Sequence, residues 1–499
     1  MSVKPETFFK HIPLPEPDLV KLVFCNSNKP AHVKKWAEEL PATQIQKTSV
    51  RLYRALPEIT KLKTDPASRL QMLESLRPYV QSCIQGLSQD FLNQPLILPD
   101  TAVKSATIAQ ALQKHMTTGY EMVARDICLN DKASSPKLLE QLTLALHRAI
   151  SGLGLILLRG FQLYIPSQRK LWVQVHQLYK LAEYWECTKV EVPDAMLVLT
   201  RGNTVQDSYN RILLLSCTRP NQLRQSEVNA VYSALELWTP YADLVQGTQN
   251  RENLFVVNLS SDLPPMYKNR FRGDSKDDIR ELDTRSLIPA LKQTMNNSSE
   301  AAQKVFRQIP ASLLTHLNNA WCINRQRHFE RRLSKGSLEV CVGLSHLHYY
   351  IADETSFKYL LQGRKGQKNL KGSRLNSASI DEIFGAKPLS AETDPWADSF
   401  DAGGGSIPVM DVELSNELDK QPSTDHPKSV VSIIDTSPGG YCLNWEESIP
   451  AQVRAGEIIG LREPGRRAWS IGLIRWVSQS KGSSQIGVEI LAPQGQAIG

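Results

Sequence analysis

The chain has 499 residues, of which 41% are apolar and 22% charged, and its formal net charge is +7 at pH 7. This length predicts two to four domains, and the apolar fraction is sufficient for packed cores, which excludes a chain too polar to fold. The modest positive charge favours an anionic ligand or a phosphate-rich surface but requires neither.

The chain shows no sign of export or membrane insertion. The first twenty residues lack the apolar core of a signal peptide. The longest apolar stretch, Ile150 to Leu158, is interrupted by Gly152 and Gly154, so we expect no transmembrane segment. Eight scattered cysteines without a CxxC pair favour buried, reduced thiols over a disulfide framework. These features predict a cytoplasmic protein.

Residues 1–320 have a mainly helical pattern. Apolar residues recur every four positions from Leu138 to Ile150, directly after a Ser135-Pro136 helix start. A second stripe, Leu171 to Trp185, is typical of a helix that faces a core rather than a ligand. The run Leu254 to Val257 is β-like, so this region either mixes helices and strands or holds two subdomains. We expect it to be an output or docking region.

A domain boundary is predicted near residue 320, with a second domain over residues 321–495. A basic segment there precedes the apolar run Val340 to Ile351, which we interpret as a strand. Residues 364–428 are rich in Gly, Ser, Asp and Lys and predict a disordered insertion. His346 and His348 would face one side of the predicted strand, but no neighbouring cysteine or carboxylate completes a metal site. We therefore expect no metal and no cofactor.

Five short apolar runs follow the insertion at the close spacing of a small antiparallel barrel. They are Val430–Ile434, Tyr441–Leu443, Glu457–Leu461, Ser470–Val477 and Ile486–Leu491. The predicted fold class is multidomain α+β, a mainly helical N-terminal region followed by a small antiparallel β-barrel.

Two short motifs belong to this barrel. The first is an arginine pair four positions apart, Arg327 and Arg331, at its entrance. The second is the run DTSPGG, residues 435–440, which follows the first predicted strand after the insertion. Together with the later runs GEIIGL and IGLIRWV, this order resembles a PilZ domain over residues 322–495.

The PilZ resemblance implies a receptor for the bacterial second messenger cyclic di-GMP, in which the segment with the arginine pair closes over the ligand. An arginine fork meets guanine O6 and N7 or a phosphodiester in bidentate fashion and keeps its charge. A carboxylate accepts hydrogen bonds from guanine N1 and N2, a serine adds a hydroxyl, and glycines permit close backbone approach. The implied ligand-binding residues are Arg327, Arg331, Asp435, Ser437, Gly439 and Gly440.

Each motif also has a plainer interpretation on its own. A second arginine pair, Arg462 and Arg466, lies downstream in a Pro-Gly turn, the wrong order for a PilZ domain, and DTSPGG alone is an ordinary turn sequence. The insertion also places the two motifs unusually far apart, although loop closure costs only slightly more as a loop lengthens.

Three further residues are candidate contacts. Arg325 and Arg332 flank the arginine pair, and their alternative role is a solvated basic surface. Trp476, in the run IGLIRWV, either flanks the ligand or belongs to the barrel core.

The expected function is a cyclic di-GMP receptor that acts on an unidentified protein partner through its N-terminal region; no nucleic-acid partner is expected. The chain has no GGDEF-like, EAL-like, GxSxG or HExxH motif, so we expect no enzyme activity. The layout is similar to FimW-type receptors, which implies a role in type IV pili or surface attachment and recruitment to a membrane-associated or polar complex. Two alternatives stay open: an enzyme in residues 1–320 that the barrel regulates, and an adaptor whose degenerate barrel binds a partner or nucleic acid without ligand.

Overall fold

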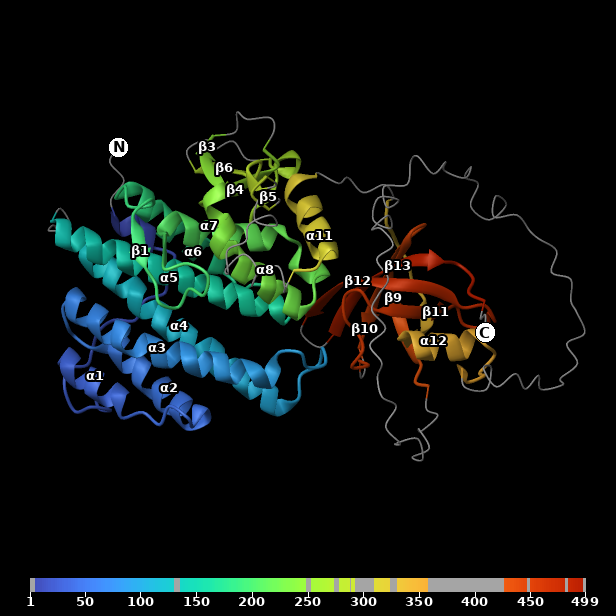
Figure 1. Cartoon of the computed structure of the whole chain (residues 1–499), viewed down its shortest axis with the longest axis horizontal. Coiled ribbons are helices and arrows are strands. Elements are labelled where there is room, and N and C mark those ends of the chain that lie inside the picture. The colour runs from blue at the N-terminus through green and yellow to red at the C-terminus, as the bar shows by residue number, and fades with distance from the viewer. Residues whose placement is uncertain are drawn as a thin grey trace, which may run out of the picture.

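The computed structural model describes residues 5–129, 135–247, 253–272, 278–287, 289–291, 309–323, 330–357, 426–446, 449–480 and 483–496. A helical region occupies the N-terminal part of the chain, and a β-barrel at the C-terminal end lies against one end of it (Figure 1). The predicted fold class is confirmed.

Long helices dominate the N-terminal region. Helix α3 packs on α4, α4 on α5, and α5 on α7. The bounds are α1 (Pro30–Glu38), α2 (Ile45–Lys61), α3 (Pro66–Phe91), α4 (Asp100–Leu129), α5 (Pro136–Gln162), α6 (Leu171–Tyr184), α7 (Val205–Cys217), α8 (Gln225–Trp238) and α11 (Ala311–Cys322).

Helix α5 begins where the sequence predicts. The Ser135 side chain caps it by accepting a hydrogen bond from the Leu138 N–H, and Pro136 occupies the first turn, where its missing N–H costs nothing. The second predicted stripe forms α6, and most of its apolar side chains are buried, so the core interpretation is confirmed.

Two glycines let α5 approach its neighbours closely. A Cβ on Gly152 would lie 2.2 Å from Thr117 Oγ1 on α4, and one on Gly154 would lie 2.8 Å from Ile212 Cγ1 on α7. By length and composition α5 is apolar enough to cross a membrane, but 78% of its most apolar window is buried inside the protein. The same glycines that interrupt the apolar run thus serve helix packing.

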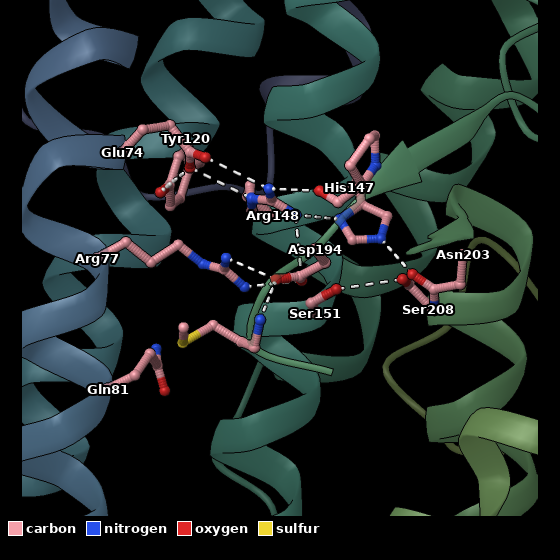
Figure 2. Close-up of polar contacts among 12 residues, drawn as sticks. Glu74, Arg77, Gln81, Tyr120, His147, Arg148, Ser151, Asp194, Asn203 and Ser208 are labelled. Atoms are coloured by element: carbon pink, nitrogen blue, oxygen red, sulfur yellow. Dashed lines mark hydrogen bonds and ion pairs between the residues drawn. The ribbon is translucent and has the colours of Figure 1, made fainter. Parts of the chain in front are cut away.

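A buried ionic network joins α3 and α5 to the strand β1 (Glu191–Pro193), which pairs with β2 (Gly202–Thr204) (Figure 2). Arg77 donates to both oxygens of Asp194, at 2.7 and 2.8 Å. Arg148 lies 3.1 Å from Asp194 and also contacts Glu74. Burial alone would raise the pKa of Asp194, but the guanidinium groups of Arg77 and Arg148 lower it. The carboxylate therefore stays ionised.

A small antiparallel sheet follows α8, in the order β3-β6-β4-β5, with β3 at Asp243–Gln246, β4 at Phe255–Asn258, β5 at Met266–Tyr267 and β6 at Ile279–Asp283. Strand β4 is the predicted β-like run, and its first three residues are buried. The N-terminal region therefore mixes helices with strands, which is one of the two arrangements the sequence allows.

The C-terminal barrel closes in the order β10-β13-β12-β11-β8-β9, because β9 also pairs with β10, and β7 adds to the edge of β9. Each of the five runs predicted after the insertion forms a strand. The bounds are β7 (Arg332–Leu333), β8 (Ser337–Val342), β9 (Ser429–Ser437), β10 (Gly440–Trp445), β11 (Ile458–Arg462), β12 (Ser470–Ser480) and β13 (Ser483–Ala492).

The interpretation of residues 340–351 as one strand was wrong. Strand β8 ends at Val342, Gly343 adopts a φ of 100°, and the helix α12 (Leu344–Ile351) follows. A residue other than glycine rarely adopts that backbone angle, so Gly343 marks the break. His346 and His348 therefore lie two positions apart on a helix and face different directions, rather than sharing one face of a strand.

One hydrophobic core fills the N-terminal region from Phe8 to Trp321, and another fills the barrel from Leu338 to Val488. The boundary near residue 320 stays a prediction. The predicted insertion lies outside the described residues except for its last three positions. All eight cysteines are free, and six of them are buried.

The two regions touch through the barrel's β12–β13 end. The Gln479 N–H donates to Tyr164 O at 2.8 Å, and its side chain donates to Leu96 O. Leu96 and Tyr164 belong to the barrel's core cluster although both lie in the N-terminal region. Arg224 adds a hydrogen bond to Ala455 O at 3.3 Å.

We expect Gly152→Ala to lower the free energy of unfolding by about 1–3 kcal/mol, because the added methyl group overpacks the α4–α5 contact. Gly160→Ala is the matched control on the same helix, since its Cβ would meet nothing closer than 3.5 Å. The free energy of unfolding of that control should stay unchanged or rise by up to about 1 kcal/mol, because alanine has a higher helix propensity than glycine. Urea denaturation followed by circular dichroism measures both, and equal midpoints for the two variants would contradict the packing argument.

A second prediction concerns Glu121 on α4, which is 3% exposed and whose pKa burial raises to about 8. Because the folded pKa lies above the unfolded one, the native state favours the proton, and stability falls as the pH rises between the two values. Glu121→Gln mimics the protonated side chain. The stability of this variant relative to the wild type should grow by up to about 1.4 kcal/mol per pH unit between pH 5 and 8. If urea denaturation gave the same difference in stability between Glu121→Gln and the wild type at every pH, the raised pKa of Glu121 would be contradicted.

Candidate functional site

The DTSPGG motif forms the β9–β10 hairpin. Asp435 and Ser437 lie at the end of β9, Pro438 and Gly439 make the turn, and Gly440 begins β10. The sequence predicts that the strand ends at Ile434. In the structure β9 continues through Ser437, because Asp435 and the two residues after it pair with β10.

A β-bulge decides which face Asp435 occupies. Val431 and Ile433 pack in the barrel core, so strict alternation would turn Asp435 inward as well. The register shifts between the Cys442 and Leu443 pairs, so Ile434 is the extra residue. Asp435 therefore faces outward, as bulges beside functional sites commonly arrange.

Four cross-strand neighbours make one row on the outer face of the barrel. Asp435 pairs with Cys442, Cys442 with Gly487, and Gly487 with Trp476. Residues paired in register point to the same side of a sheet, so this row joins the motif on β9 to the tryptophan on β12. We call Asp435, Cys442, Gly487 and Trp476 the outer row.

Trp476 lies over Gly487 and not in the barrel core. A Cβ on Gly487 would lie 1.8 Å from Trp476 Nε1, so only glycine leaves room for the indole. Trp476 is half-buried, whereas Trp445 and Trp469 are buried within the barrel domain. Of the two roles that the sequence allows for Trp476, the core role is therefore excluded.

The last glycine of the motif is required by strand packing. A Cβ on Gly440 would lie 1.9 Å from the backbone oxygen of Val488 on β13. Opposite it, Ser437 Oγ donates to Gly440 O at 3.4 Å, and Gly439 O accepts from the Ile490 N–H at 3.0 Å. Ser437 lies two residues after Asp435, so both side chains are on the outer face.

Arg331 pairs with Asp435 across the entrance of the barrel. Its Nη1 lies 3.2 Å from Asp435 Oδ2, and the two side chains are 34% and 17% exposed. Strand β7 holds this segment in place, with Leu333 opposite Asp435 and Arg332 opposite Thr436. Arg332 is therefore on the other face from Asp435, and its contact with a ligand stays a prediction. Arg325 and Arg327 lie outside the described residues.

Two charged side chains and one thiol that were not singled out from the sequence lie around the β9–β10 hairpin. Glu489 on β13 lies opposite Gly440 and forms an ion pair with Arg475, the bulged residue of β12. Burial raises the pKa of the Cys442 thiol, the Asp435 charge adds to this effect, and Arg331 opposes it. The thiol in the outer row is therefore neutral at physiological pH. Cross-strand register reveals these three residues, and no local motif marks them.

The second arginine pair is structural. Arg462 donates to Glu339 on β8 at 2.7 Å and lies 4.6 Å from the Trp469 ring, whereas Arg466 pairs with Glu463 in the hairpin. Neither of these ion pairs includes a residue of the outer row. This arrangement agrees with the downstream position of the pair in the sequence.

The described residues contain no cluster of three or more potential metal ligands. His346 contacts His426 through the two Nδ1 atoms at 3.1 Å, and His426 stacks on Tyr349. His348 instead lies edge-on to Phe357. The histidines of α12 thus take part in separate packing contacts.

The closed six-stranded barrel, the DxSxxG hairpin and the arginine at its entrance define a PilZ domain. A family model described as the middle PilZ domain of the cyclic-di-GMP receptor FimW matches residues 254–497, and the model of the FimW N-terminal domain matches residues 31–249. The chain belongs to the FimW family of cyclic-di-GMP receptors.

The cyclic-di-GMP receptor FimW of Pseudomonas aeruginosa is 30% identical to this chain over 511 aligned positions. The alignment covers 97% of this chain and 81% of that receptor. No solved structure matches the chain. The likeness in layout inferred from the sequence is confirmed, including the N-terminal region, where no motif signalled it.

We expect Gly440→Ala to destabilise the barrel by about 1–3 kcal/mol or more, because the new methyl group collides with the β13 backbone rather than with a movable side chain. Gly336→Ala is the matched control in the same domain, since its Cβ would meet only Ile433 Cδ1, at 3.6 Å. Limited proteolysis in urea measures the stability of the barrel. If both variants resisted equally, the strand-packing role of Gly440 would be refuted.

Proposed function

We propose that this chain binds cyclic di-GMP on the outer face of its PilZ barrel and relays occupancy to a protein partner through its N-terminal region. The contacts are made by Arg327, Arg331, Asp435, Ser437, Gly439 and Gly440, with Trp476 at the flank. The observation that carries the proposal is the meeting of Arg331 and Asp435 beside the outer row, although 104 positions separate them in the chain.

The ion pair between Arg331 and Asp435 suits a ligand that replaces it. Both side chains are partly exposed, and an exposed pair contributes only about 0–1 kcal/mol. A guanine base offers Asp435 its N1 and N2 hydrogens and offers Arg331 its O6 and N7. Arg331 and Asp435 therefore each gain hydrogen bonds to the ligand, and the free energy lost when their ion pair breaks is small.

The outer row provides a platform beside these groups. Trp476 presents its ring next to Gly487, and an aromatic face stacks on a nucleobase with about 1–3 kcal/mol per base in single-stranded complexes. The neutral Cys442 thiol adds no negative charge to repel a phosphodiester.

Strands β12 and β13 connect the outer row to the N-terminal region. Strands β12 and β13 carry Trp476 and Gly487 of the outer row, and their shared hairpin end also carries Gln479, which bonds to Tyr164 and Leu96. We place the receptor in the cytoplasm, without enzyme activity of its own, in the control of type IV pili, motility or surface attachment. The partner's identity is left to experiment.

Calorimetric titration of cyclic di-GMP into the purified chain tests the site. Wild type should bind saturably, and Arg331→Ala and Asp435→Ala should each weaken binding at least tenfold. The reason is that a hydrogen bond to a charged group contributes about 1.5–3 kcal/mol, and about 1.4 kcal/mol equals a factor of ten. The double variant Arg327→Ala/Arg331→Ala should abolish binding, and GTP is the nucleotide control.

Arg466→Ala is the matched control, because it removes the equivalent arginine of the other pair, which is exposed and satisfied by Glu463. It should bind like the wild type. No binding to any form would refute the receptor function and favour the adaptor with a degenerate barrel. Turnover of cyclic di-GMP or another substrate by the intact chain would favour the regulated enzyme instead.

A further inference from the structure

A cavity of about 750 Å³ lies where the helical region meets the barrel. One wall is formed by α4 and α5, and the other by the ends of β10, β12 and β13. This volume falls within the range of about 300–1,000 Å³ that is usual for small-molecule sites, which commonly form between domains. Among the described residues, the cavity lining and the proposed cyclic di-GMP site have none in common.

Most of the cavity wall is apolar. The side chains of Ile97, Leu98, Leu157, Phe161, Ile165 and Trp445 line it. Such a lining suits a hydrocarbon segment, because each buried CH₂ group contributes about 0.8 kcal/mol.

One buried cation interrupts this apolar wall. Arg159 on α5 is 6% exposed and lines the cavity, where its Nη1 donates to Gln110. Within the part of the chain that the structure describes, Arg159 has no carboxylate partner. The other buried arginines of α3 and α5 differ in this respect, since Arg69 lies 3.9 Å from Asp126 and Arg148 lies 3.1 Å from Asp194 (Figure 2).

The charge on Arg159 persists despite burial. Burial lowers the pKa of the guanidinium to about 10, and no carboxylate among the described residues opposes this shift. Arg159 therefore stays protonated at neutral pH. A buried charge without a counter-ion is costly, so an anion placed beside it would be strongly favoured.

Two polar residues of α4 lie near the same end of the cavity. Gln110 and Lys114 are four positions apart, so they share one face of the helix, and both line the cavity. Among the lining residues that the structure describes, the one carboxylate is Glu446 on the barrel wall, where Asn444 Nδ2 donates to it at 2.8 Å. The cavity thus has a cationic end on the helices and an apolar body.

We propose that this cavity binds a single-chain anionic amphiphile. Its carboxylate or phosphate head would be held by Arg159 and Lys114, and its aliphatic chain would lie between α5 and the barrel. The ligand would contact both regions of the protein at once, so its binding would fix their relative position. This inference goes beyond the proposed cyclic di-GMP function and does not depend on it.

Calorimetry on the intact chain tests this proposal with decanoate, decyl phosphate and the uncharged control decanol. We expect saturable binding of at least one anion, with decanol at least tenfold weaker. Binding of decanoate alone would identify a carboxylate ligand, and binding of decyl phosphate alone a phosphate ligand. If no anion bound, or if decanol bound as tightly as the anions, the proposal would be overturned.

Two variants locate the site. Arg159→Gln should remove the preference for an anion over decanol, whereas Arg54→Gln, at an exposed arginine of α2, should not. Leu157→Trp should fill the cavity and weaken all probes. Because Arg159 has no carboxylate partner among the described residues, we expect its replacement to preserve the fold, which far-UV circular dichroism checks. An anion preference that survived in Arg159→Gln would refute the assignment of the head group.

Discussion

The β-bulge at Ile434 is the constraint on which the candidate site depends. Side chains alternate along a strand, and a slip of one residue moves every side chain to the opposite face. Without the bulge, Asp435 would follow Val431 and Ile433 into the core, where an ionised carboxylate without partners is costly. The bulge turns Asp435 and Ser437 outward while the core side chains before them keep their places. The spacing of the motif, with one residue between Asp435 and Ser437, then puts both on one face.

The protein contains two kinds of ion pair, which differ in how much free energy is lost when they break. The pairs of Asp194 with Arg77 and Arg148 are buried and multiply hydrogen-bonded, and they join elements far apart in sequence (Figure 2). Breaking such a pair leaves an uncompensated buried charge, so this network is a fixed part of the helical region. The pair of Arg331 and Asp435 is single and partly exposed, so exchange for a ligand costs little. The Asp194 network is therefore rigid, whereas the pair of Arg331 and Asp435 is exchangeable.

Local signals in the sequence predicted much of the fold. The Ser135-Pro136 start and the four-residue period located α5, and short apolar runs at close spacing located five strands of the barrel. The helix α12 was missed because its run of apolar and histidine residues suits either state, and only the backbone angle of Gly343 separates it from β8. The motifs identified Asp435 and Ser437. Cys442 and Gly487 were missed because their place beside Asp435 comes from pairing across strands. Arg159 was missed because its burial, without a carboxylate partner among the described residues, is a property of the packed structure.

Only a few residues of the barrel strands separate the candidate site from the helical region. Trp445 lies three residues beyond Cys442 on β10, which at about 3.3 Å per residue is roughly 10 Å. Trp445 lines the interdomain cavity, and its pairing partner Ser484 does so as well. A ligand that repositions Trp476 would act on β12, whose other end contacts Tyr164 and Leu96 through Gln479. Under the proposed function, the strands shared by the outer row and the contacts with Tyr164 and Leu96 link occupancy of the outer face to the seating of the barrel on the helical region.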